Sequence, residues 1–239
     1  MTMRLDKLLA RLGEASRSGC RDLLKGGRVQ VNGETVRSGA FPVPEGALIT
    51  LDGQALDCRM DRYLMMNKPA GVLTAREDAR QKTVMDLLPP VYASLGCMPV
   101  GRLDKDTTGL LLLTTDGELA HRLISPARHV DKVYEARVEG KLEQKDVEAF
   151  AAGIPLGDFT ALPARLEILS PDAGLATVRE GKFHQVKRMF GAVGKPVLAL
   201  RRQRFGPLSL DEALRPGDYR ELNEEEIAAL YAAAGIKHE

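Results

Sequence analysis

The chain is poor in cysteine and contains no long apolar segment. Its three cysteines, Cys20, Cys58 and Cys97, are odd in number and have no CxxC spacing, so we expect neither disulfides nor a thiol-rich metal site. A membrane helix needs about 20 consecutive apolar residues, and no run approaches that length. The start of the chain also lacks the apolar core of a secretory signal. These absences favour a protein of the reducing cytoplasm with no membrane partner.

Signatures of several common enzyme classes are also missing. The sequence has no GxxxxGK[ST] phosphate loop, no GxGxxG after a predicted strand, no GxSxG and no HExxH. Kinase, dehydrogenase, serine hydrolase and zinc-protease functions therefore lose support. Histidine spacing gives no sign of a metal site either.

The net charge is only +1, but the charges are unevenly distributed. Residues 4–37 hold eight Lys and Arg against four acids, and residues 181–204 hold seven and no acid. Residues 211–239 hold three Lys and Arg against eight acids. Basic clusters can neutralise phosphates and release counterions, which favours a nucleic-acid partner for the first two blocks. The alternative is a solvated, salt-bridged surface, which we favour for 211–239.

The first part of the chain has the pattern of a small module of two helices and a short sheet. Apolar spacing predicts a helix over 5–12, and Ser16 is a suitable N-cap for a second helix that ends before Gly26. Alternation over 28–36 around Asn32-Gly33 predicts a hairpin, and a further strand is expected at 47–51. The polar segment 54–61 is the predicted linker, which places the domains at 1–58 and 59–239.

The second part of the chain predicts a larger domain of strands and helices. Strands are expected at about 63–66, 109–114, 132–139, 162–169, 175–180 and 197–205, and helices at 117–124, 143–152, 184–193 and 224–234. Residues 67–71 contain Pro and Gly and are predicted to form a turn. Because turns as well as helices separate the strands, the pattern indicates an α+β fold with a mainly antiparallel sheet.

The segment 101–109, GRLDKDTTG, is the most informative one, and four leucines follow it directly. It places Asp104 in a polar loop at a strand end, where active sites concentrate. Asp104 could be a nucleophile or general base, or a loop aspartate that caps a turn or pairs with Arg102. Asp106 could complete a DxD metal pair, but no third ligand of suitable spacing accompanies it.

The segment 180–190, EGKFHQVKRMF, predicts a glycine turn followed by a helix. His184, Lys187 and Arg188 would share one helix face. A fixed cation at a helix start suits an ion pair with a functional carboxylate, because the pair favours the ionised and therefore nucleophilic form. Contact with phosphate, or simple solvation, is the alternative for Lys187 and Arg188.

Tyr134 lies in the alternating segment 132–138, KVYEARV. A tyrosine in a half-buried strand is by default a packing residue. If its face lined a cleft beside Asp104, the phenol could stack on a base or take part in proton transfer.

These motifs, in this order, resemble those of the pseudouridine synthases of ribosomal RNA. Residues 4–37 are similar to the small RNA-binding module named after ribosomal protein S4. Segments 67–71 (NKPAG), 101–123, 132–138 and 180–190 are similar to motifs of the catalytic domain. The implied fold is an S4-like αβ RNA-binding domain followed by a synthase domain with a mainly antiparallel mixed sheet and flanking helices. The HQVKRMF form is most similar to that of synthases acting on 16S rRNA, with a 23S rRNA synthase as the alternative.

The resemblance implies roles for individual residues. Asp104 matches the family's nucleophile, and Tyr134 matches a tyrosine that contacts the flipped base and is implicated in proton transfer. Lys187 matches the basic residue that pairs with the aspartate, where the family often has arginine; the adjacent Arg188 is the alternative. The residues expected to contact RNA are Arg4, Lys7, Arg17, Arg21, Arg28, Arg102, His184 and Arg188.

The implied reaction converts uridine to pseudouridine by breaking the N-glycosidic bond and joining the ribose to C5 of uracil. It involves no net redox change or hydrolysis, so no cofactor or metal is expected. The expected partner is ribosomal RNA or an assembling small-subunit particle, bound by a monomer. Whether Asp104 adds to the sugar, adds to the base or assists a glycal route is left open. Two alternatives are a non-catalytic rRNA-binding or ribosome-assembly protein and a metal-dependent nucleic-acid enzyme that uses Asp104 and Asp106.

Overall fold

The structure is a computed structural model that describes residues 3–237, except for the side chain of Arg17. Contacts divide the chain into two compact units. The N-terminal unit comprises Met1–Asp61 and Leu88–Cys97, and the larger unit comprises Arg62–Leu87 and Met98–Glu239. The domain boundary between residues 58 and 59 stays a prediction.

The N-terminal unit contains helices packed against a four-stranded sheet of order β2-β1-β3-β4. The Ser16 side chain accepts a hydrogen bond from the Gly19 amide at 3.2 Å, as expected of an N-cap. Asn32 and Gly33 both have positive φ, which is the geometry of a tight hairpin turn. The elements are α1 (Leu5–Arg11), α2 (Arg17–Lys25), α3 (Pro90–Leu95), β1 (Val29–Val31), β2 (Glu34–Thr35), β3 (Ile49–Leu51) and β4 (Gln54–Ala55).

Strand β4 corrects the prediction for the segment 54–61. Gln54 and Ala55 pair with β3 in antiparallel register, so the linker cannot begin at residue 54. The strand has only two residues, both exposed, and such a short element carries no readable hydrophobic period.

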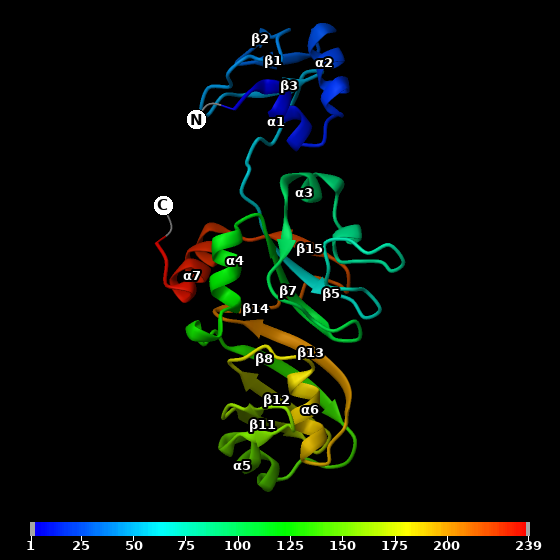
Figure 1. Ribbon diagram of the computed structural model, residues 1–239, viewed down its shortest axis with the longest axis vertical. Helices are drawn as coiled ribbons and strands as arrows, with labels where there is room; N and C mark the ends of the chain where they lie inside the picture. The colour runs from blue at the N-terminus through cyan, green and yellow to red at the C-terminus, as the bar shows by residue number, and fades with distance from the viewer. Residues whose placement is uncertain (1–2, 238–239) are drawn as a thin grey trace. The chain divides into compact units, whose positions relative to one another are not determined.

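The larger unit is built on a nine-stranded sheet with the order β11-β12-β8-β13-β7-β5-β15 (Figure 1). Strand β14 pairs with β13, and β6 pairs with β7. Among the pairs described, β13 and β7 run parallel and the others antiparallel, which confirms the predicted α+β class with a mainly antiparallel sheet. The strands are β5 (Tyr63–Lys68), β6 (Met98–Pro99), β7 (Thr108–Thr114), β8 (Lys132–Val138), β11 (Arg165–Ser170), β12 (Ala173–Val178), β13 (Val197–Phe205), β14 (Leu208–Ser209) and β15 (Tyr219–Glu221).

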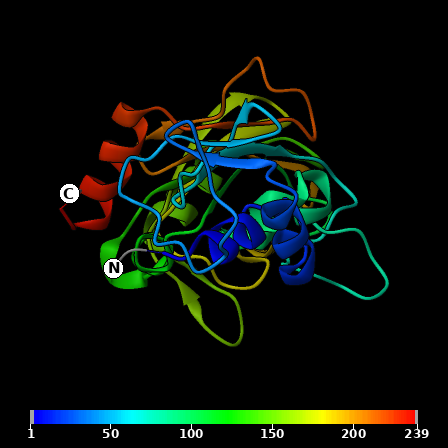
Figure 2. The same cartoon turned by 90° about the horizontal axis from the view of Figure 1, so that it is seen from above.

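Helices flank this sheet and bury its apolar side chains. Helices α4 and α7 lie side by side (Figures 1 and 2) and form one core with β5 and β7, in which Leu119, Leu112 and Ile227 are buried. Phe150 of α5 packs on Phe190 of α6, with ring centroids 4.8 Å apart. The remaining elements are α4 (Gly117–Ile124), α5 (Gln144–Ala152), α6 (Gln185–Ala192), α7 (Glu224–Ala234), η1 (Met85–Leu87), η2 (Pro126–Arg128) and the pair β9 (Ile154–Pro155) and β10 (Thr160–Ala161).

Strand β5 is longer than the sequence pattern indicates. Asn67 and Lys68, predicted to lie in a turn, continue the strand and pair with Leu110 and Gly109 of β7. The chain turns only after Pro69, which has no amide hydrogen for a ladder bond. As a result, the Lys68 side chain is buried beside the loop that precedes β7.

The parallel pairing of β7 with β13 depends on Gly109. Its φ is +98°, and a Cβ at this position would lie 2.3 Å from the carbonyl oxygen and 2.8 Å from the amide nitrogen of Arg202. Only glycine allows this backbone approach. The pairing sets the loop 101–107 beside strand β13.

Candidate active site

A small cavity of about 60 Å³ in the larger unit collects most of the residues predicted to form the site. Its lining comes from the loop before β7, from β8 and β13, from the end of β12 and from the turn into α6. Arg102, Asp104, Tyr134, His184 and Lys187 are all among the lining residues. The fold therefore brings segments far apart in the sequence to one place.

Asp104 lies between two nitrogen groups. Its Oδ2 is 3.2 Å from Lys187 Nζ, and its Oδ1 is 3.4 Å from His184 Nε2. The side chain is 27% exposed, so it can meet a ligand while most of it is shielded from water. Lys105, the adjacent cation, donates instead to Gln81 Oε1 at 2.7 Å. The Asp104–Lys187 contact has the geometry expected for the predicted ion pair.

Lys187 also binds a second carboxylate. Its Nζ is 2.5 Å from Oδ1 of Asp106, whose side chain is 74% exposed. Burial lowers the pKa of Lys187, but hydrogen bonds to Asp106 and Asp104 outweigh that effect and raise it above the ordinary value. The hydrogen bond from Lys187 in turn lowers the pKa of Asp106. The lysine is thus held as a cation by two carboxylates.

The two aspartates show no sign of a metal centre. Among residues 3–237, no group of three or more His, Cys, Asp or Glu side chains could hold a metal ion. Asp106 instead accepts a hydrogen bond from Lys187.

The loop that carries Asp104 is fixed through its backbone by Lys68. The Nζ of this fully buried side chain lies within hydrogen-bond distance of the carbonyl oxygens of Pro69 (3.0 Å), Asp104 (3.1 Å), Lys105 (3.3 Å) and Thr107 (3.0 Å). Burial lowers the pKa of Lys68 to about 8. Sequence reasoning missed this residue, although a lysine shortly after the apolar run 64–66 was the available signal.

Thr74 also binds this loop. Its hydroxyl donates to the Leu103 carbonyl at 2.8 Å and accepts from the Leu103 amide at 3.2 Å. The backbone N–H and C=O of Leu103, the residue before Asp104, are therefore both hydrogen-bonded to Thr74.

Tyr134 is buried on β8, opposite Arg202 of β13. The Arg202 Nη1 donates to the Tyr134 hydroxyl at 3.4 Å, and its Nε donates to the Leu110 carbonyl at 2.7 Å. The guanidinium carbon lies 5.0 Å from the Phe205 ring centroid, a cation–π contact. The buried Arg202 guanidinium thus contacts the hydroxyl of Tyr134, which lines the cavity.

Arg202 was not predicted as a site residue, because the sequence indicated it only as one of the basic residues of 181–204. Its Nη2 is buried without a hydrogen-bond partner among the described atoms. The sequence signal that could have identified Arg202 is the alternation of buried and exposed residues along β13, in which Leu200 and Arg202 share one face.

Arg188 does not pair with Asp104. It donates to the Leu156 carbonyl at 2.5 Å and forms an ion pair with Asp158, so it is not the alternative partner of the aspartate. Helix geometry explains the difference, because consecutive residues lie about 100° apart around the axis.

The predicted RNA contacts of the N-terminal unit fall into two groups. Arg4 pairs with Asp6, and Arg28 pairs with Asp52, with Nε 2.8 Å from Oδ1. Lys7 and Arg21 are exposed on α1 and α2, whereas the side chain of Arg17 lies outside the described part of the structure. Exposed cations remain available to phosphate, and all these contacts stay predictions.

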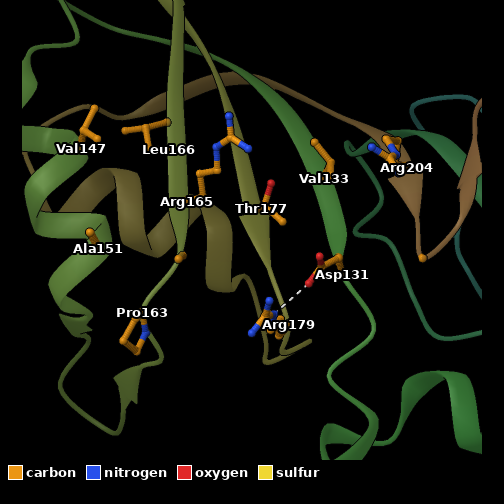
Figure 3. A pocket seen from close by; sticks show the side chains of 12 residues that line it. Asp131, Val133, Val147, Ala151, Pro163, Arg165, Leu166, Thr177, Arg179 and Arg204 are labelled. Carbon is orange, nitrogen blue, oxygen red and sulfur yellow. Dashed lines mark hydrogen bonds and ion pairs between the residues drawn. The ribbon is translucent and has the colours of Figure 1, made fainter. Parts of the chain in front are cut away.

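A larger hollow of about 610 Å³ in the same unit lies on another part of the sheet (Figure 3). Arg165, Thr177, Val133 and Arg204 succeed one another across β11, β12, β8 and β13 and line it. Because side chains alternate along a strand, Val133 faces away from its neighbour Tyr134. None of the predicted catalytic residues lines this hollow.

Comparison with known proteins gives two family matches. A model described as RNA pseudouridylate synthase matches residues 62–192, and a model of the S4 domain matches residues 3–49. An uncharacterized RNA pseudouridine synthase, YtzG, of Bacillus subtilis (strain 168) is 47% identical over 234 residues, covering 95% of this chain and 98% of the relative. Ribosomal small subunit pseudouridine synthase A of Escherichia coli (strain K12) is 42% identical over 232 residues, covering 95% and 100%.

The fold matches a solved structure as well. A crystal structure of a pseudouridylate synthase superposes with a TM-score of 0.68 at 37% identity, covering 96% of this chain and all of that chain. The similarity therefore extends over both units of the sequence.

Proposed function

The chain belongs to the RNA pseudouridylate synthase family, and on this premise we propose that it isomerises a uridine of 16S ribosomal RNA, with Asp104 as the nucleophile. The observation that supports the assignment most is the Asp104 carboxylate held between Lys187 and His184 in the cavity that Tyr134 lines. The small-subunit target is supported by relatives named ribosomal small subunit pseudouridine synthase A, which are 42% identical to this chain over nearly their whole length.

The chemistry requires an ionised carboxylate in a shielded place. The N1–C1′ bond of uridine breaks, a C5–C1′ bond forms, and the proton lost from C5 is balanced by one gained at N1. Lys187 keeps positive charge beside Asp104 without a strong bond to the reacting oxygen, since its shorter contact is to Asp106. Tyr134 contacts the base and takes part in proton transfer.

Exclusion of water protects the intermediate stage, in which the base is detached from the sugar. The target uridine has to leave its stack to reach Asp104. A cavity of about 60 Å³ is small, so the entering base displaces the water there. Hydrolysis of the sugar and loss of the free base are thereby disfavoured.

RNA binding is shared by both parts of the chain in this proposal. Residues 1–58 form the S4-like RNA-binding domain and 59–239 the catalytic domain, acting as a monomer in the cytoplasm on rRNA or on an assembling small-subunit particle. The S4 match at residues 3–49 supports the first of these roles. The part of the chain that the structure describes contains no helix long and apolar enough to span a membrane.

Pseudouridine mapping across the rRNA of cells with and without the gene tests the proposal. We expect one pseudouridine of 16S rRNA to be absent in the deletion strain and restored by the wild-type gene. Loss of a site in 23S rRNA would replace the proposed target, and an unchanged map would contradict rRNA modification altogether.

A further inference from the structure

Phe183 is the most exposed of the large apolar side chains in residues 3–237, at 77%. Exposure of a phenylalanine side chain to water is unfavourable relative to its burial. The residue follows Lys182 in the turn between β12 and α6, next to the cavity of Asp104. An aromatic ring that is exposed beside a binding site can stack on a ligand.

The ring of Phe183 stacks on the imidazole of His184. Their centroids are 3.8 Å apart and the ring planes differ by 18°. His184 has φ of 50°, a left-handed conformation that few residues other than glycine adopt. Its Nε2 in turn contacts Asp104. The stack therefore connects the exposed ring to the reacting carboxylate.

The turn that displays Phe183 is braced from within. The buried Gln185 side chain donates to Glu180 Oε2 at 3.0 Å and accepts from the Lys182 amide at 3.2 Å. Lys182 Nζ lies 4.0 Å from the ring centroid of Phe159, which holds the preceding side chain in place. The orientation of Phe183 is thus set before any ligand arrives.

We propose that Phe183 is a stacking platform for an unpaired nucleobase that flanks the target uridine; this inference rests on the proposed function. His184 lines the cavity of Asp104 and Phe183 does not, so the base on Phe183 is a neighbour of the reacting one.

The platform compensates a specific cost of the reaction. When the target base leaves its stack, each adjacent base loses a stacking partner. Stacking of a base on an aromatic side chain contributes about 1–3 kcal/mol, which corresponds to roughly 5- to 150-fold in affinity. Because every base has a π face, this contact does not by itself select a sequence.

A single-tryptophan variant tests the contact directly. The sequence contains no tryptophan, so Phe183→Trp introduces one fluorophore at the platform. In an Asp104→Asn background, which binds without turnover, we expect a 16S rRNA fragment to quench its fluorescence. Replacing the flanking nucleotide by an abasic one should remove that quenching, and a fully paired RNA duplex should quench little.

Leu169→Trp is the matched control. Leu169 is an apolar residue of β11 that is 50% exposed. Its neighbour Ser170 pairs with Ala173, the first residue of β12, whereas the cavity is lined by Val178, the last residue of β12. Position 169 is therefore next to the end of β12 that is remote from the cavity. A tryptophan at position 169 should keep its fluorescence when the same RNA binds. Equal quenching at both positions would contradict a localised platform.

Affinity gives the second readout. Phe183→Ala should weaken binding of the rRNA fragment roughly 5- to 150-fold, whereas Phe183→Tyr, which keeps a stacking ring, should bind like wild type. Unchanged affinity of Phe183→Ala would overturn the inference.

The outcomes separate the two proposals. If wild type forms pseudouridine while Phe183→Trp is not quenched, the platform is wrong and the proposed function stands. If wild type modifies no rRNA while the fluorophore is quenched by unpaired RNA, the proposed function is wrong and the contact stands.

Discussion

At the scale of single residues, Lys187 is shared between two carboxylates with different surroundings. Its Nζ is 3.2 Å from the shielded Asp104 and 2.5 Å from the exposed Asp106. A lysine offers three donors around a point charge, so it can serve both partners. This arrangement places a positive charge beside Asp104 while the shorter contact of Lys187 is to Asp106.

Loss of the Lys187 cation should lower the rate of the chemical step. Lys187→Met should lower the single-turnover rate by about 100-fold or more, because Asp104 loses the positive charge beside it and the loop loses the contact between Lys187 and Asp106. Lys187→Arg, which keeps the charge, should retain a rate within about tenfold of wild type. A Lys187→Met variant with native circular dichroism and a rate within twofold of wild type would contradict the role given to the pair.

Lys132 is a buried cation with a measurable pH signature. Its Nζ donates to the Val130 carbonyl at 2.8 Å, and burial together with nearby Arg202 lowers its pKa to about 8. Between that value and 10.5, the unfolded chain keeps a proton that the folded protein has released. The free energy of unfolding therefore rises with pH in this window.

Comparison of wild type with Lys132→Met isolates the effect. From pH 8 to pH 9.5, the difference in unfolding free energy between wild type and the variant should grow by at most about 1.4 kcal/mol per pH unit, in favour of wild type. Urea denaturation followed by circular dichroism measures it. Parallel pH curves would show that Lys132 keeps an ordinary lysine pKa.

At the scale of secondary-structure elements, the parallel pair β7–β13 is the contact on which the site depends. It places the loop of Asp104 next to the strand that carries Arg202. Gly109 makes the approach possible, since a Cβ there would lie 2.3 Å from the Arg202 carbonyl oxygen.

Gly109→Ala should therefore be far more harmful than an ordinary glycine substitution. Gly140 has a similar φ of +85° but nothing within 4 Å of its Cβ position, which makes Gly140→Ala the matched control. The control should lose about 1–2 kcal/mol from left-handed backbone strain. Gly109→Ala should lose about 1–3 kcal/mol more from the steric clash, or fail to fold. Equal stabilities would contradict the structural role of Gly109.

The central strands were predictable from the sequence because they are buried on both sides. The apolar run before residue 114 predicted strand 109–114, and the structure has Thr108–Thr114. Strands β4 and β15 escaped prediction, because a strand of two or three residues at a sheet edge carries no period. Tertiary pairing, rather than local sequence, determines such elements.

The candidate site was predictable only for residues that stand in recognisable polar segments of the sequence. Asp104 and Lys187 stand in polar segments at element ends, which indicated a functional pair. Lys68 acts on backbone carbonyls that the fold gathers, and Arg202 acts on a neighbouring strand. The contacts of these two side chains cannot be predicted until the register of the strands is known.

At the scale of the whole molecule, an almost neutral chain carries separate basic surfaces. The net charge of +1 hides the block at 4–37, where Lys7 and Arg21 are exposed. Such local charge, not the total, determines attraction to phosphate.

Salt dependence should reveal these contacts. A Lys7→Gln/Arg21→Gln variant should bind 16S rRNA more weakly, and the slope of log Kd against log[salt] should decrease by about 1–2. Lys145→Gln, which removes an exposed cation of α5 in the larger unit, is the control and should leave the slope unchanged. An unchanged slope for the double variant would place RNA binding elsewhere on the protein.

The central claim is that one carboxylate performs the reaction, and the most direct measurement compares two aspartates of the same loop. We predict that Asp104→Asn forms no pseudouridine in 16S rRNA while its RNA affinity stays close to wild type. Asp106→Asn, which changes the other partner of Lys187, should remain active. Pseudouridine formation by Asp104→Asn at the wild-type rate would contradict the account.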